Sequence, residues 1–286
     1  MQEPSVAIVG IVGRFLRTGN LDDPLKVWPG ENWLARAKQV DAAWREALVS
    51  AVMDRAPNAT APAELAAMNV TAFARKKAEP MVRGLFPQIE QENVLTLLER
   101  SLVFLSPAMI SGVLRKMPWP RTAWNLANLY LASYGAETLS RDELGIVGLS
   151  AETTCYVSVG YFHRVGRFED FVVHEMAHIF HNCKRETAGL RETRRREWLL
   201  DIDYRKRETF AYACEAYSRI LKIGGATEAR QRHLEEIEER EMPPDELVDP
   251  GEYLDILREA VAARNGWKRI LKRCSPSPRG DPCNAQ

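Results

Sequence analysis

An HExxH motif, His174-Glu175-Met176-Ala177-His178, constrains this chain more than any other feature of its sequence. On a helix, positions i and i+4 project to the same side, about 6 Å apart. Two imidazoles at that spacing can bind one zinc ion, and the glutamate between them can reach a water held by the ion. The motif therefore predicts a helix that carries a metal site on one face.

The residues around the motif fit such a helix. Glu169 and Asp170 stand where the helix would begin, which favours capping and suits the helix dipole. His181 falls on the side of the motif histidines, and we expect it at the surface, with a contact to substrate as the alternative. An amphipathic helix with solvated histidines is the competing interpretation. The opposite side is an apolar arc of Val172, Val173, Met176, Ala177, Ile179 and Phe180.

Two histidine ligands require a third ligand, and the metzincin pattern cannot supply it. That pattern places glycine and histidine where this chain has His181 and Lys184. Glu197 lies at the H-x18-E spacing of an aminopeptidase-like class, but three arginines precede it in place of the usual Asn-Glu-Gly sequence. We therefore interpret Glu197 as a solvated charge.

Glu208 is the preferred third ligand. It lies in a helix predicted over residues 201–222, on the side that also carries Tyr204, Tyr212 and Glu215. Glu215 could orient a ligand histidine as a hydrogen-bond acceptor, or could itself be the ligand with Glu208 in support. The core-facing stripe of this helix is Phe210, Ala213, Cys214, Tyr217, Ile220 and Leu221.

An HExxH motif followed some tens of residues later by a helical glutamate resembles the gluzincin branch of the zincin metalloproteases. The segment Glu208-Thr209-Phe210-Ala211-x-Ala213 is similar to the third-ligand segment of anthrax lethal factor-like peptidases. The resemblance covers residues 170 to 220. It implies His174, His178 and Glu208 as Zn²⁺ ligands and Glu175 as the general base.

The resemblance also implies a reaction. A zinc ion with three protein ligands keeps a position for water and lowers the pKa of that water toward neutrality. Glu175 would accept the proton and pass it to the leaving amine. The phenol of Tyr204 or Tyr212 could stabilise the oxyanion, and packing is the alternative role for both. Of the remaining histidines, we expect His163 only to flank the site and His233 to be solvated.

The segment before the motif predicts two strands. Residues 153–161 are rich in β-branched and aromatic residues, and residues 144–149 could pair with them across a turn at 150–152. In zincins such a strand lies above the active-site helix, and its edge binds an extended peptide. A peptide-binding role for residues 153–161 therefore follows from the resemblance alone.

Composition excludes several classes of function. The chain has 39 basic and 39 acidic residues among 286, which gives no general case for nucleic-acid binding. No stretch approaches the roughly 20 apolar residues of a membrane span, and residues 6–12 make a poor signal peptide. Cys155, Cys183 and Cys214 have core-like surroundings, which favours reduced thiols and a cytoplasmic location; Cys274 and Cys283 could pair only after export.

Hydrophobic periodicity predicts helices in the rest of the chain. We expect a helical N-terminal region over residues 1–120 that could recognise a substrate or partner, a zincin-like region over 121–274, and a disordered tail over 275–286. The basic run 191–196 is expected to be a solvated connection. The predicted helices cover residues 31–55, 63–78, 88–105, 107–117, 124–134, 228–241 and 249–273.

Together with the resemblance, these features predict a mostly helical α+β protein with a zincin-like region. We expect a zinc-dependent endopeptidase that hydrolyses a peptide bond in a protein or extended peptide, without nucleic acid or membrane as partners. Two alternatives remain. One is a sensor peptidase that cuts a single partner such as a repressor. The other is a binding protein in which a metal only joins two helices, against which an intact Glu175 argues because a structural site needs no base.

Overall fold

A computed structural model describes residues 6–21, 25–140, 147–163, 166–193, 196–239 and 242–276. The chain is mostly helical with one small sheet, as the sequence predicts, and folds into two compact units. The first unit comprises residues 1–68, 104–149 and 156–164, and the second comprises 69–103, 150–155 and 165–286. This division differs from the predicted boundary near residue 120, because residues 69–103 belong to the second unit.

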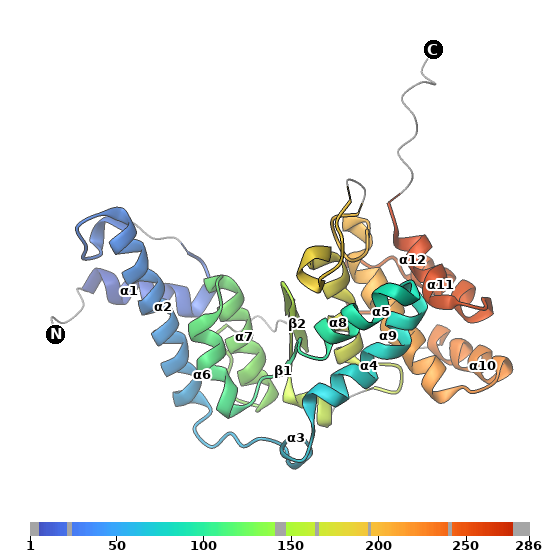
Figure 1. Ribbon diagram of the computed structural model, residues 1–286. Helices are drawn as coiled ribbons and strands as arrows, with labels where there is room; N and C mark the ends of the chain where they lie inside the picture. Colours follow the sequence, from blue (N-terminus) through green and yellow to red (C-terminus); the bar gives the residue numbers. More distant parts are fainter. Residues whose placement is uncertain are drawn as a thin grey trace. The chain divides into compact units, whose positions relative to one another are not determined.

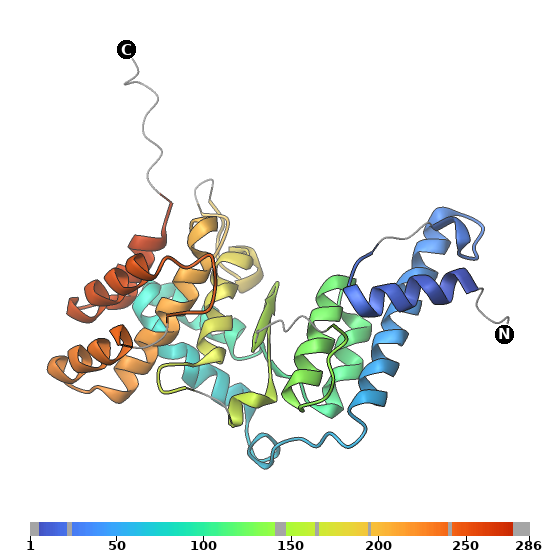
Figure 2. The ribbon, with the colours of Figure 1, turned by 180° about the vertical axis from the view of Figure 1, so that it is seen from behind.

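The first unit is a group of helices packed on one another. The long helix α2 contacts α1, α6 and α7, and it lies beside α6 and α7 in Figures 1 and 2. Asn32 caps α2 by accepting a hydrogen bond from the Ala35 backbone at 3.0 Å. The helices of this unit are α1 (Val6–Thr18), α2 (Trp33–Arg55), α3 (Ala63–Ala66), α6 (Pro107–Lys116) and α7 (Pro120–Ser133), with a 3₁₀ turn η1 (Leu25–Val27) and another, η2 (Val159–Phe162).

The second unit holds the motif helix. That helix, α8, packs against α9 and α4, and α9 is covered in turn by α10, α11 and α12. Trp267 of α12 meets Tyr217 of α9 edge to face, with ring centroids 4.9 Å apart. The helices are α4 (Val70–Leu85), α5 (Gln88–Leu98), α8 (Phe171–Asn182), α9 (Arg207–Ile223), α10 (Thr227–Glu238), α11 (Pro250–Ala262) and α12 (Gly266–Cys274), with 3₁₀ turns η3 (Arg185–Ala188) and η4 (Tyr204–Lys206).

Three strands, β1 (Leu102–Phe104), β2 (Gly148–Ala151) and β3 (Thr154–Val157), form a sheet in the order β1-β3-β2. The predicted strand 153–161 is shorter than expected, since residues 159–162 form η2. In the prediction for residues 144–149, positions 144–146 lie outside the described residues. Because β3 is central, both of its edges are paired, so an extended peptide could be added only to β1 or β2 among the described strands.

Several predicted helices have different limits. The helix expected over 63–78 is two helices, because Asn69 caps a new one by accepting from the Ala72 backbone at 3.0 Å. The helix expected over 88–105 ends at Leu98, and the residues of β1 follow it. The helix expected over 249–273 breaks at residues 263–265, where Asn265 caps α12. Residues 240–241 of the predicted helix 228–241 and residues 277–286 of the predicted tail lie outside the described residues.

The core of the second unit is built on α8. The six residues of the predicted apolar arc are all fully buried, and Phe180 packs edge-on against Phe86 with centroids 5.2 Å apart. Cys155, Cys183, Cys214 and Cys274 are buried free thiols; Cys283 lies outside the described residues. Among the described residues no helix has the length and apolar character needed to cross a membrane.

Candidate metal centre

The side chains of His174 and His178 from α8 and of Glu208 from the first turn of α9 converge. The Nε2 atoms of the two histidines are 3.2 Å apart. Oε2 of Glu208 lies 3.4 Å from Nε2 of His178 and 3.7 Å from Nε2 of His174. The predicted helix start near residue 201 is wrong, because η4 precedes α9 and places Glu208 at the N-terminal end of that helix.

The spacing of these three atoms fits a metal ion. A tetrahedral ion with bonds of about 2.0–2.1 Å holds neighbouring ligand atoms about 3.3–3.4 Å apart. The observed separations of 3.2, 3.4 and 3.7 Å lie close to that value. Two imidazole nitrogens and one carboxylate oxygen are also ligands that zinc and other first-row divalent ions accept. His174, His178 and Glu208 can therefore hold a metal ion.

Glu215 contacts His174 on the side of the imidazole opposite Nε2. Its Oε2 lies 3.2 Å from Nδ1 of His174, on the far side of the imidazole from the ligand nitrogen. If Nε2 binds a metal, Nδ1 carries the ring proton and donates a hydrogen bond to this carboxylate. The position of Glu215 is that of a hydrogen-bond acceptor for a ligand histidine, one of the two roles that the sequence left open.

The second histidine is supported by a third one. Nδ1 of His178 lies 3.0 Å from Nε2 of His181, whose Nδ1 lies 3.1 Å from Oδ1 of Asn182. His181 is 4% exposed, so the expectation of a surface histidine is wrong. Burial, the neighbouring His178 and the Arg207 cation lower the pKa of His181 to about 3. A neutral His181 can accept a hydrogen bond from Nδ1 of His178 and donate one from its own Nδ1 to Asn182, which fixes the tautomers of both histidines.

The support of His174 extends to a third helix. Oε1 of Glu215 accepts a hydrogen bond from the backbone of Asp170 at 2.5 Å, at the start of α8. The Asp170 carboxylate pairs with Lys77 of α4 and makes no capping bond, and that of Glu169 accepts from the Gly166 backbone at 2.8 Å. The expected capping by these two carboxylates is therefore wrong: a tertiary ion pair engages Asp170, and a local hydrogen bond to the Gly166 backbone engages Glu169.

The electrostatics of the cluster favour a cation. Burial works against a charged His174, but hydrogen bonds to Glu208 and Glu215 outweigh it and raise its pKa to about 10. Burial likewise opposes ionisation of Glu208, but its contacts with His174 and His178 keep the pKa of Glu208 low. The carboxylates that hold a proton on His174 can equally compensate the charge of a metal ion.

Glu175 is buried beside the cluster, with 5% of its surface exposed. Burial raises the pKa of its carboxyl above 4.5, and the charges of His174 and His178 partly oppose that rise. A carboxyl group whose pKa is raised is suited to exchanging a proton near neutral pH. The thiol of Cys155 in β3 lies close enough for the Glu175 charge to act on it.

The two tyrosines proposed from the sequence lie in different surroundings. The ring of Tyr212 packs edge-on against His174, with centroids 4.4 Å apart. Burial and the charge of Glu215 raise the pKa of the Tyr212 phenol, so it keeps its proton at neutral pH. Tyr204 is 79% exposed in η4, and the guanidinium of Arg207 lies over its ring.

The other candidates lie away from the cluster. Glu197 is exposed and pairs with Lys184 at 2.9 Å, as a solvated charge should. His163 is exposed. His233 was expected to be solvated, but it is largely covered, lying against the Phe168 ring and 3.3 Å from a carboxylate oxygen of Glu236. Residues 194–195 of the basic run 191–196 lie outside the described residues.

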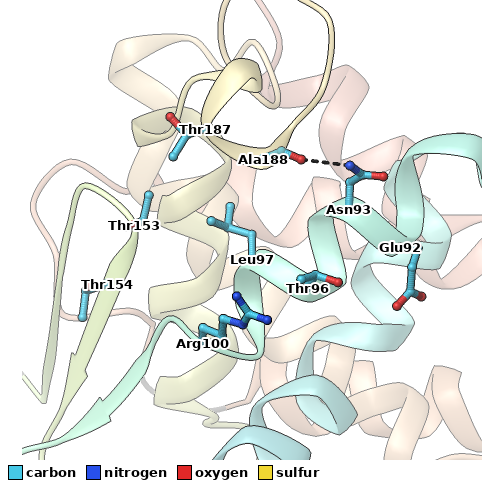
Figure 3. A pocket seen from close by; sticks show the side chains of 9 residues that line it. All are labelled: Glu92, Asn93, Thr96, Leu97, Arg100, Thr153, Thr154, Thr187 and Ala188. Carbon is cyan, nitrogen blue, oxygen red and sulfur yellow. Dashed lines mark hydrogen bonds between the residues drawn. The ribbon is translucent and has the colours of Figure 1, made fainter.

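The described residues of the second unit line two cavities near the sheet and the cluster. One of about 360 Å³ is lined by α5, the β2–β3 turn and η3, with four threonines and Arg100 around it (Figure 3). It contains none of the residues of the metal cluster. The other, of about 350 Å³, is lined by Tyr212 and Glu215, both of which contact His174.

The sequence predicted that His174, His178, Glu208 and Glu215 lie together, with Glu208 preferred to Glu215 as the third ligand, but it missed the supporting roles of His181 and Lys77. His181 carried a signal, because position i+3 from His178 faces the same side of a helix. Lys77 carried no such signal in the sequence, since it is 93 residues distant from its partner Asp170.

No protein-family model matches the chain, and comparisons with curated proteins and with solved structures find no match either.

Proposed function

We propose that this protein is a zinc-dependent endopeptidase that hydrolyses a peptide bond in a protein or extended peptide. The observation that carries the proposal is the cluster of His174, His178 and Glu208 with the buried carboxyl of Glu175 beside it. A site that only joined two helices would need the ligands but not an adjacent carboxyl group with a raised pKa. When bound, zinc would lower the pKa of a water molecule and polarise the scissile carbonyl group.

The residues of the chain have separate roles in this proposal. Glu175 takes a proton from the attacking water and delivers it to the leaving amine. Glu215 and His181 hold the rings of His174 and His178 so that Nε2 of each stays deprotonated. The phenol of Tyr212, protonated at neutral pH, can donate a hydrogen bond to the oxyanion of the substrate. Tyr204 is the other candidate for that role, since its exposure leaves it free to turn toward a bound substrate.

Zinc content measured by elemental analysis tests the first half of the proposal. We expect about one zinc per wild-type chain, lost in Glu208→Ala and His178→Ala and retained in Glu197→Ala. At a zinc concentration about 100 times Kd, the metal should add about 2.7 kcal/mol to the free energy of unfolding. Failure of the wild type to bind zinc would refute the proposal.

Peptide hydrolysis tests the second half. The zinc-loaded wild type should cut protein substrates such as unfolded casein, and Glu175→Gln should bind zinc equally well but lose at least about 100-fold in rate. Inactivity on casein together with cleavage of one co-purifying protein would favour the sensor peptidase. Full zinc occupancy with activity that Glu175→Gln does not reduce would leave only a non-catalytic metal site.

A further inference from the structure

A cavity of about 350 Å³ lies beside the metal cluster, within the range of about 300–1,000 Å³ typical of small-molecule sites. Its walls come from the segment 166–169 that precedes α8, from α9, α10 and α11, and from the segment 242–244. Most of the lining is apolar or aromatic, and includes Phe168, Ala216, Ile237, Met242, Pro243 and Tyr253.

The charged groups that line this cavity already have partners within the protein. Arg167 pairs with Glu236 at 2.7 Å, and Glu169 accepts a backbone hydrogen bond from Gly166. Both oxygens of Glu215 are used, by the Asp170 backbone and by His174. An anionic ligand would therefore lose its hydration without gaining a free counter-charge. A cationic ligand would meet only the Glu169 carboxylate, which is exposed and therefore screened by water, so the mostly apolar cavity suits an uncharged ligand.

Two lining residues connect the cavity to the metal cluster. Tyr212 lines the cavity, and its ring packs edge-on against the imidazole of His174, with centroids 4.4 Å apart. Glu215 presents one carboxylate to the cavity and to Nδ1 of His174. A ligand that packs against these residues acts on the orientation of a metal-binding ring from its far side, opposite the ligand nitrogen.

We infer that this cavity is a binding site for a small, uncharged aromatic or apolar molecule, and that its occupancy is coupled to metal binding through Tyr212 and Glu215. The coupling rests on the proposed zinc site, whereas ligand binding in the cavity does not. Coupling between two sites is reciprocal, so the ligand should change zinc affinity by the same factor by which zinc changes ligand affinity.

Equilibrium dialysis with naphthalenemethanol tests the cavity, using metal-free and zinc-loaded protein. We expect saturable binding of one molecule per chain, and at least about fivefold weaker binding of naphthoate and naphthylmethylamine, which carry a charge. Zinc should change the affinity for naphthalenemethanol by about fivefold or more. Absence of saturable binding to both forms of the protein would overturn the inference.

Two matched variants locate the ligand. Ala216→Leu fills the cavity beside Tyr212 and should weaken binding about tenfold or more, while Ala188→Leu, in the separate cavity of Figure 3, should leave it unchanged. Met242→Gln also tests whether the ligand binds in this cavity, without a change in the core. It should weaken binding because it replaces an apolar side chain of the cavity wall with a polar one. The reverse pattern, with loss in Ala188→Leu alone, would place the ligand elsewhere and overturn the assignment.

Comparison of ligand binding to metal-free and zinc-loaded protein distinguishes failure of the zinc site from failure of the coupling. If the protein binds no zinc, the proposed function and the coupling fail together, and binding to metal-free protein still decides the cavity. If naphthalenemethanol binds with the same affinity with and without zinc, the cavity stands and the coupling is refuted.

Discussion

Glu215 accepts a hydrogen bond from Nδ1 of His174 at 3.2 Å, while Nε2 of the same ring faces His178 and Glu208. One imidazole thus lies between a buried carboxylate and the metal-binding cluster. The carboxylate fixes both the rotation and the tautomer of the ring, which are the properties on which metal binding depends.

Replacement of Glu215 by glutamine should lower zinc affinity by about 10- to 100-fold. The amide has one carbonyl oxygen, so it cannot accept from both the Asp170 backbone and His174, as the carboxylate does. Competition for zinc with a chromophoric chelator measures the change. Glu197→Gln is the control, because Glu197 pairs only with Lys184 in solvent; equal loss in both variants would contradict the assigned role.

His181→Phe should lower zinc affinity about tenfold, because it keeps a buried ring but removes the acceptor for Nδ1 of His178. The unpaired buried N–H should also destabilise the metal-free protein by about 1–3 kcal/mol. His181→Gln retains a carbonyl acceptor and should recover part of both losses. Chelator competition and thermal unfolding measure them, and identical behaviour of the two variants would show that only ring packing matters.

The ion pair of Glu90 with Arg185 should make the second unit sensitive to acid. The two side chains are 12% and 4% exposed, and their nearest atoms are 2.6 Å apart. Burial opposes ionisation of Glu90, but the hydrogen bonds from Arg185 outweigh it and hold its pKa below 4.5. The folded state then binds fewer protons than the unfolded state, so this stabilisation is complete above about pH 4.5 and is lost as the pH falls further.

Glu90→Gln checks that relationship. It should lower the free energy of unfolding at neutral pH by about 3 kcal/mol, because it leaves the buried Arg185 without a carboxylate. The variant should also lose stability less steeply than the wild type below about pH 4.5. Denaturant unfolding at several pH values measures both the loss of stability at neutral pH and the steepness of the loss below about pH 4.5. Glu197→Gln, which removes an exposed pair, should change the neutral-pH stability by less than about 1 kcal/mol.

Gly84→Ala should destabilise the packing of α4 on α12. A Cβ atom at residue 84 would overlap the indole of Trp267, and Asn265 donates to the Gly84 carbonyl at 3.0 Å, which holds the two segments together. We expect a loss of about 1–3 kcal/mol. Gly112→Ala in α6 meets nothing within 4 Å and should instead stabilise by about 0.5–1 kcal/mol. Thermal unfolding of the two variants separates the cost of steric overlap at residue 84 from the stabilisation expected when any helical glycine is replaced by alanine.

Much of the cluster could be predicted from the sequence, because its spacing is helical. His174 and His178 share one face of α8, and Glu208 and Glu215 share one face of α9. Which glutamate faces the ligand nitrogens could not be predicted. The two lie two turns apart on the same face, and only the packing of α9 on α8 decides which one comes level with the histidines.

The sequence by itself determined the local features of this protein: its helical periodicity and the HExxH helix with its apolar arc. These depend on residues a few positions apart, within reach of one another on a helix. Only the tertiary structure decided the place of β1, the burial of His181 and the pairing of Asp170 with Lys77. A short strand needs hydrogen bonds from another strand, and a buried polar group needs a partner; here those partners are distant in the chain.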